Sequence, residues 1–205
     1  MAAGRLSGIA VALVAALLAL ARPASADEAL WDRLREGGRI VLLRHMATTS
    51  GVGDPPGFRL EDCATQRNLS PAGRLQAEAL GRAFRERGVA VTRVLSSEWC
   101  RCLDTANLLG LGTVERFEPL NSIFQASPEG PRRTAALRAF IRDWRGPGNA
   151  LLVTHQVNIT ALTGEVPAMG AALVLSPVPA PGPEGFTLLG RLPPPPIPDS
   201  KETTP

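Results

Sequence analysis

Short apolar segments alternate with amphipathic segments along this chain, and that alternation is the strongest constraint on its fold. The runs at 39–44 (RIVLLR), 89–95 (VAVTRVL) and 149–154 (NALLVT) are typical of buried strands, because each is apolar along nearly its whole length. Helices are predicted for 30–35, from Ser70 to about Arg87, from Ser96 or Ser97 to Leu109, and for 134–144 and 157–162; further strands are predicted for 113–117, 172–175 and 186–192. This order predicts three α/β/α layers around a mainly parallel central sheet.

The N-terminus has the features of a secretory signal. A positive start at Arg5 precedes an apolar stretch over 9–20, and small residues at 24–26 form a cleavage site. The apolar stretch is shorter than the ~20 residues that a membrane span requires. We therefore expect residues 1–26 to be cleaved, no transmembrane segment to remain, and the protein to be periplasmic or secreted; an uncleaved anchor, or cleavage after 19–21, is the alternative.

The remainder is the right length for one domain, which we expect over 27–192. The net charge of the whole chain is +3, and residues 1–26 carry two arginines and no acid, so the mature charge is +1. Such a balance argues against nucleic acid as a partner. The segment 193–205 is rich in proline and polar residues, and we expect it to be disordered.

Three cysteines, Cys63, Cys100 and Cys102, occur in a chain expected to leave the cytosol. An oxidising compartment favours one disulfide and one free thiol. Cys63 is expected to take part in it, because the other two are too close in sequence to bridge comfortably on a helix. The spacing of cysteines and histidines does not fit a zinc site, so no metal is expected.

Both histidines of the chain follow predicted strands. His45 comes after IVLLR and His155 after ALLVT, and the carboxyl ends of parallel strands meet at one edge of a sheet. Arg44 precedes the first histidine, and Arg101 lies early in the predicted helix after the second strand. Arginine forks and a helix N-terminus both suit a phosphoryl group, so these residues predict an anion pocket.

Four motifs give the chain a resemblance to the histidine phosphatase superfamily, also called phosphoglycerate-mutase-like. They are 44–48 (RHMAT), 69–77 (LSPAGRLQA), 96–106 (SSEWCRCLDTA) and 153–155 (VTH), in the family's order, and the resemblance extends over roughly 39–165.

The resemblance implies a metal-independent phosphatase that forms a phosphohistidine and needs no cofactor. His45 would be the nucleophile, and Arg44, Arg101 and His155 would bind and stabilise the phosphoryl oxygens. Thr48, Arg67 and Gln156 are candidates for binding substrate. In this setting a disulfide from Cys63 to Cys100 or Cys102 would join the first loop to the phosphate-binding helix, and Cys100 is favoured.

Two departures from the family pattern stand out. Met46 replaces the usual glycine after the nucleophile, and we expect it to shape the pocket wall. Neither usual proton donor is present, because Leu120-Asn121-Ser122 and Gln156 stand at those positions; Asp62, Glu98, Glu118 and Glu165 are the other carboxylates considered.

The function predicted from these residues is hydrolysis of phosphomonoesters outside the cytosol. The substrate would be a phosphorylated small molecule or an envelope component, such as a glycolipid, with a phosphohistidine as a further option. A non-catalytic anion-binding or interaction protein that retains the pocket is the alternative from a different class. The sequence does not indicate an oligomeric state.

Overall fold

The structure is a computed structural model that describes residues 26–124, 127–178 and 185–196 of the 205-residue chain. The expected signal segment lies outside the described residues except for Ala26, which begins the first described helix. The expected tail lies outside them from residue 197 onward.

The elements follow the alternation that the sequence predicts. The helices are α2 (Ala26–Arg35), α3 (Pro71–Glu86), α4 (Cys100–Leu109), α5 (Gly130–Asp143) and α6 (Gln156–Thr163), with short 3-10 turns η1 (Cys63–Thr65) and η2 (Glu118–Leu120). The strands are β1 (Ile40–Arg44), β2 (Val91–Ser96), β3 (Val114–Arg116), β4 (Asn149–Thr154), β5 (Ala172–Pro177) and β6 (Phe186–Leu192).

One six-stranded sheet runs through the middle of the molecule in the order β3-β2-β4-β1-β5-β6. The pairs β2–β3, β2–β4 and β1–β4 are parallel, and β5 is antiparallel to both β1 and β6. The prediction of a mainly parallel sheet within an α/β fold is therefore confirmed.

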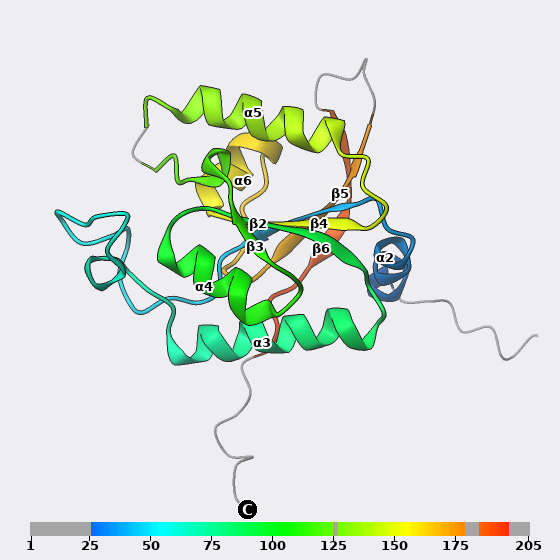
Figure 1. Cartoon of the computed structure of the whole chain (residues 1–205), viewed down its shortest axis with the longest axis horizontal. Coiled ribbons are helices and arrows are strands. Elements are labelled where there is room, and N and C mark those ends of the chain that lie inside the picture. Colours follow the sequence, from blue (N-terminus) through cyan, green and yellow to red (C-terminus); the bar gives the residue numbers. More distant parts are fainter. Residues whose placement is uncertain (1–25, 125–126, 179–184, 197–205) are drawn as a thin grey trace, which may run out of the picture.

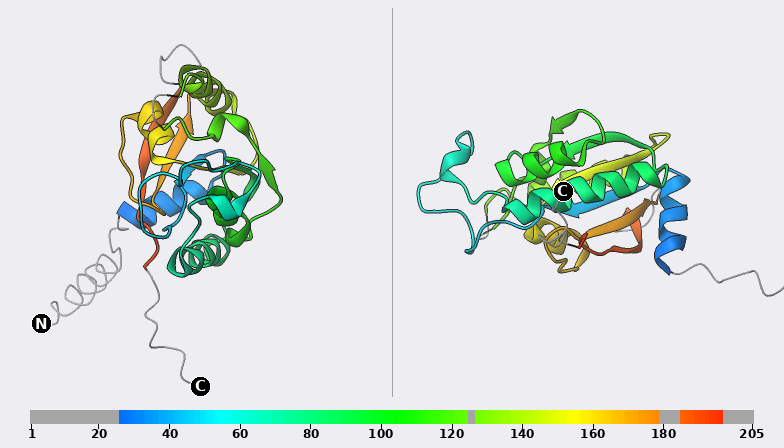
Figure 2. Two further views of the ribbon diagram at one scale, coloured as in Figure 1. Left: turned by 90° about the vertical axis from the view of Figure 1, so that its left-hand side faces the viewer. Right: turned by 90° about the horizontal axis from the view of Figure 1, so that it is seen from below.

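Helices cover both faces of the sheet, and alternate residues of each strand face opposite layers (Figures 1 and 2). In β1, Val41 and Leu43 pack with residues of α2, α3 and α4 in one apolar cluster. Ile40 and Leu42 pack with residues of α5 and α6 in a second cluster. The continuous apolar run of this strand is explained by burial on both faces.

Three helices begin elsewhere than the sequence predicts, and the first is α2, which starts at Ala26 rather than 30. Helix α4 starts at Cys100 after an N-cap at Trp99 that makes no side-chain capping bond, because Ser96 extends β2 and the hydroxyl of Ser97 contacts His155. Helix α5 starts at Gly130 rather than 134 and takes Pro131 into its first turn, where a missing N–H costs nothing. Within the described ranges, no helix combines the length and the apolar character that a bilayer span requires.

Two glycines of α3 permit close approaches that a side chain would prevent. A Cβ at Gly81 would lie 1.9 Å from the backbone oxygen of Leu109, at the end of α4. A Cβ at Gly73 would lie 2.0 Å from the backbone oxygen of Ala47, two residues after His45. The first glycine therefore sets the packing of α3 on α4, and the second sets the loop that follows the nucleophile candidate.

Replacing Gly81 with alanine is expected to lower the free energy of unfolding by about 1–3 kcal/mol, because overpacking outweighs the gain in helix propensity of about 1 kcal/mol. Urea denaturation measures this change. The matched variant Gly73→Ala should be destabilised similarly and should also lose turnover, whereas Gly81→Ala should keep its turnover. An unchanged stability of Gly81→Ala would contradict the close approach of the two helices.

Candidate active site

The pairing of β1 with β4 brings the two histidines together. Arg44 is the partner of Thr154 in the parallel register, so the next residues, His45 and His155, leave adjacent strands at the same level. The backbone N–H of His45 donates to the carbonyl of Thr154 at 3.0 Å, and the two ring centroids are 5.6 Å apart.

His45 is held as a neutral imidazole with one free nitrogen. Its Nδ1 lies 2.9 Å from the carbonyl oxygen of Met46, which can only accept, so Nδ1 carries the proton and Nε2 keeps its lone pair. The side chain is 3% exposed. Burial lowers the pKa of His45 to about 3, and the charges of Arg101 and Arg44 act in the same direction. The hydrogen bond to the Met46 carbonyl raises this pKa, but by less. The ring therefore keeps an unprotonated Nε2 at neutral pH.

His155 has the opposite tautomer. A terminal nitrogen of Arg101 donates to its Nδ1 at 3.3 Å, so Nε2 carries the proton and donates to the hydroxyl of Ser97 at 2.9 Å. Burial and then the charge of Arg101 hold the pKa of His155 well below its usual range. This imidazole is oriented by two fixed partners and stays neutral.

Three arginines surround the histidines and keep unused donors. Arg44 Nη1 donates to the carbonyl of Pro167 at 2.8 Å, and Arg67 Nη1 donates to the carbonyl of Gly51 at 2.6 Å. The buried Nε atoms of Arg44, Arg67 and Arg101 have no hydrogen-bond partner among the described residues. Unpaired donors are costly when buried, so this cluster is suited to bind an anion.

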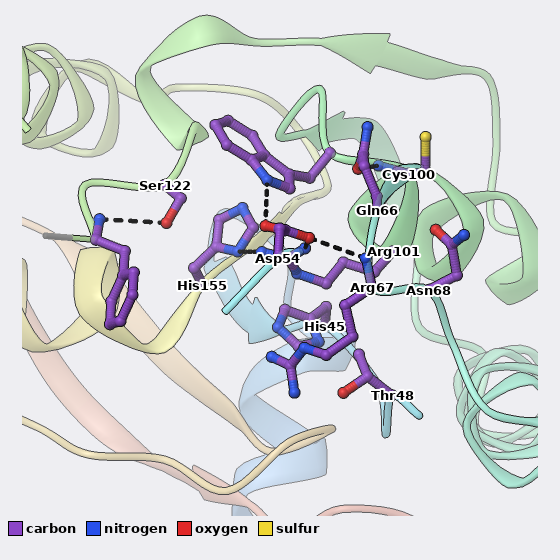
Figure 3. A network of polar contacts seen from close by, with 12 residues as sticks. His45, Thr48, Asp54, Gln66, Arg67, Asn68, Cys100, Arg101, Ser122 and His155 are labelled. Carbon is purple, nitrogen blue, oxygen red and sulfur yellow. Dashed lines mark hydrogen bonds and ion pairs between the residues drawn. The ribbon is translucent and has the colours of Figure 1, made fainter. Parts of the chain in front are cut away.

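Asp54, which no motif in the sequence indicates, enters the same pocket from the loop after β1. Its carboxylate accepts from Arg101 Nη1 at 2.7 Å, from the backbone N–H of Arg67 at 3.0 Å and from Trp99 Nε1 at 3.0 Å (Figure 3). Burial raises the pKa of this carboxyl, but the three donors and the charge of Arg101 outweigh burial and lower it. Asp54 is ionised in this state.

A second polar network supports His155 from behind. The hydroxyl of Ser97 donates to Asn121 Oδ1 at 3.3 Å, and Asn121 Nδ2 donates to the carboxylate of Glu98 at 2.6 Å. Glu98 is thus the one acid of the four considered from the sequence that connects to the site.

The other three carboxylates considered as proton donors are engaged elsewhere. Glu118 pairs with Arg132 and Arg133, Asp62 with Arg59, and Glu165 with Arg191. None of the three lines the pocket among the described residues.

Of the three residues predicted to bind substrate, two line the pocket and one does not. Gln156 lines the pocket, as does Arg67. Thr48 does not, and its hydroxyl lies 3.7 Å from the sulfur of Met169. The expectation that Met46 shapes the pocket wall is wrong: the side chain is fully buried in the core, where a Cβ on Gly170 would come within 2.9 Å of its sulfur.

The disulfide joins Cys63 to Cys100, the pair that the sequence favoured. It ties the loop after β1 to the first residue of α4, directly before Arg101. Gln66 reinforces this connection by accepting from the backbone N–H of Cys100 at 3.0 Å. Burial raises the pKa of the free Cys102 thiol to about 12, so it stays protonated and unreactive.

The pocket has a volume of about 290 Å³, with a charged floor and an apolar mouth. His45, His155 and Arg101 form the buried floor. Around the mouth, Val52, Phe58, Phe124 and Val157 add apolar surface, and Val52 is 91% exposed. In the described part of the chain, no group of three or more His, Cys, Asp or Glu side chains is arranged to hold a metal ion.

The pocket lies at the carboxyl edge of the parallel strands, where α/β proteins bind their ligands, and its arginines suit a phosphoryl group. A family model described as "Histidine phosphatase superfamily (branch 1)" matches residues 40–123, a segment that contains Arg44, His45 and Arg101. The chain therefore combines this fold with the sequence pattern of the histidine phosphatase superfamily over that segment, and members of this superfamily are phosphatases or mutases.

Solved structures confirm the fold. The protein histidine phosphatase SixA, complexed with tungstate, is 16% identical with a TM-score of 0.53, over 75% of this chain and 96% of that one. The protein of open reading frame Rv3214 from Mycobacterium tuberculosis is 20% identical with a TM-score of 0.53, over 73% and 94%. No curated protein matches the chain.

The two histidines should show opposite neutral tautomers in imidazole ¹⁵N NMR spectra, with the proton on Nδ1 of His45 and on Nε2 of His155. Both rings should remain neutral as the pH falls from 8 to 5, because their pKa values are lowered in the folded state. Below the usual histidine pKa of about 6.5 the unfolded chain binds protons that the folded chain does not. The free energy of unfolding should therefore decrease as the pH is lowered below that value. A ring that titrates with a midpoint near 6.5 would contradict this site.

Proposed function

We propose that this protein is an exported phosphatase that hydrolyses phosphomonoesters through a phosphohistidine on His45. The observation that carries the proposal is the free Nε2 lone pair of a buried neutral imidazole beside three guanidinium groups with unused donors. The pattern match over residues 40–123 supports the same chemistry.

The reaction proceeds in two displacements. His45 Nε2 attacks phosphorus while the ester P–O bond breaks, and the Met46 carbonyl stabilises the imidazolium that forms by accepting its Nδ1–H. Water then attacks phosphorus, the P–N bond breaks, and the electron pair returns to Nε2; the proton that this water releases balances the one that the alcohol oxygen takes up in the first step. Arg44, Arg67 and Arg101 balance the phosphoryl charge in both steps.

Export is proposed from the N-terminal segment and the cysteines. The apolar stretch 9–20 and the small residues at 24–26 have the pattern of a cleavable signal. The disulfide between Cys63 and Cys100 is of a kind that persists in oxidising compartments. An exported hydrolase fits these features better than a mutase.

The apolar mouth favours esters whose alcohol carries an aromatic or aliphatic group. Three of the six large apolar side chains that are exposed in the described structure, Val52, Phe58 and Phe124, line this one pocket. A sugar or a glycerol would leave that surface in contact with water, whereas an aryl group would cover it.

The His45→Ala variant is expected to lose roughly three orders of magnitude or more in kcat/KM for p-nitrophenyl phosphate. Rapid quench of the wild type, expressed as residues 27–205, should trap a phosphoryl adduct that is labile in acid and stable in base. The absence of both turnover and adduct over a broad panel of phosphate esters would instead indicate a non-catalytic anion-binding protein.

The Phe124→Ala variant should raise the KM for naphthyl phosphate by about tenfold and leave that for glycerol phosphate unchanged. Loss of roughly 1–2 kcal/mol of apolar contact gives this factor. Steady-state kinetics measure it, and Val166→Ala, an exposed apolar residue outside the pocket, is the matched control. Equal changes in KM for both substrates would show that the mouth does not select the alcohol.

A further inference from the structure

Asp54 is the only carboxylate among the described residues that line the pocket. Its side chain is 7% exposed, and every donor that holds it also belongs to the site: Arg101, Arg67 and Trp99. While it is ionised, a buried carboxylate in the middle of an anion pocket disfavours binding of a phosphoryl dianion, and protonation removes this repulsion.

The carboxylate lines the same pocket as His45, on a loop that also reaches the mouth. His45 lies at the floor, whereas Val52 and Phe58, on either side of Asp54 in the chain, are exposed at the mouth. In an in-line displacement the leaving oxygen lies opposite the attacking nitrogen. Attack by His45 from the floor therefore directs the leaving oxygen toward the part of the pocket from which Asp54 projects.

Building on the phosphatase function proposed above, we propose that Asp54 is the general acid that protonates the leaving oxygen. As the P–O bond breaks, the Asp54 carboxyl gives its proton to the alcohol oxygen and becomes a carboxylate. In the second step the same carboxylate takes a proton from the attacking water while the P–N bond breaks. Free phosphate and neutral His45 are regenerated, and the proton is back on Asp54.

Substrate supplies the reason for Asp54 to take up a proton. A phosphoryl dianion bound through the unpaired Nε of Arg101 competes with Asp54 for the charge of the same guanidinium, whose Nη1 holds Asp54 in the unliganded state. The carboxylate then shares its cationic partner with a dianion and faces that dianion, and both changes raise its pKa. The groups that face it otherwise are Arg67 and Trp99, with His45 and His155 lining the same pocket.

The Asp54→Asn variant tests the assignment by its dependence on the leaving group. For an alkyl phosphate, whose alkoxide needs protonation, kcat/KM should fall by roughly 10²–10³-fold. For p-nitrophenyl phosphate, whose phenolate leaves unprotonated, the loss should be less than about tenfold. Asp104→Asn is the matched control, because Asp104 lies on α4 outside the pocket and pairs with Arg74.

A second variant and a binding measurement keep the test decisive. Trp99→Phe removes one hydrogen-bond donor to Asp54 but keeps the carboxyl. Its kcat/KM values for the alkyl phosphate and for p-nitrophenyl phosphate should therefore change by the same factor. Calorimetry of tungstate binding in buffers of different ionisation enthalpy should show net proton uptake by the wild type and none by Asp54→Asn.

Equal losses on both substrates in Asp54→Asn would assign Asp54 to positioning of Arg101 and overturn the inference. Proton uptake that persists in Asp54→Asn would assign the proton to a histidine and would also overturn it. The binding measurement needs no turnover, so failure of the phosphatase proposal and failure of the Asp54 proposal give different results.

Discussion

The parallel pairing of β1 with β4 is the contact on which the whole site depends. Its register sets Arg44 beside Thr154, so that the residues after them, His45 and His155, emerge together at one edge of the sheet. Both strands are buried on their two faces, and a slip by one residue would turn apolar side chains out of both clusters. The same packing energy that fixes the core therefore fixes the separation of the two imidazoles.

Burial determines which side chains of the pocket carry charge. A histidine protonated among three arginines would add like charge in a low-dielectric site, so both imidazoles stay neutral and the guanidinium groups carry the positive charge. Their hydrogen bonds assign opposite tautomers, which leaves Nε2 of His45 unprotonated. In the proposed reaction, attack and charge balance are thus divided between residue types that need no change of protonation before substrate arrives.

The sequence predicted the parts of the site that depend on local patterns. Apolar runs identified β1 and β4, and the rule that parallel strands end together placed both histidines at one edge. Asp54 was overlooked because a Gly-Asp-Pro-Pro-Gly stretch is typical of a turn, and only the path of the loop shows that this side chain points inward. Met46 was misplaced for a related reason, since its space in the core is created by Gly170, far along the chain.

The loop between β1 and α3 links the arginine-lined part of the pocket to its apolar mouth. It carries Asp54 and the half-buried Arg67 in the lining of the pocket and Phe58 at its mouth. A segment with so little regular structure would lose considerable entropy on ordering, and the bond between Cys63 and Cys100 reduces that cost by anchoring it beside Arg101. Because one anchored segment positions all three groups, a change within this loop that alters the mouth should also shift Asp54 relative to the buried histidines.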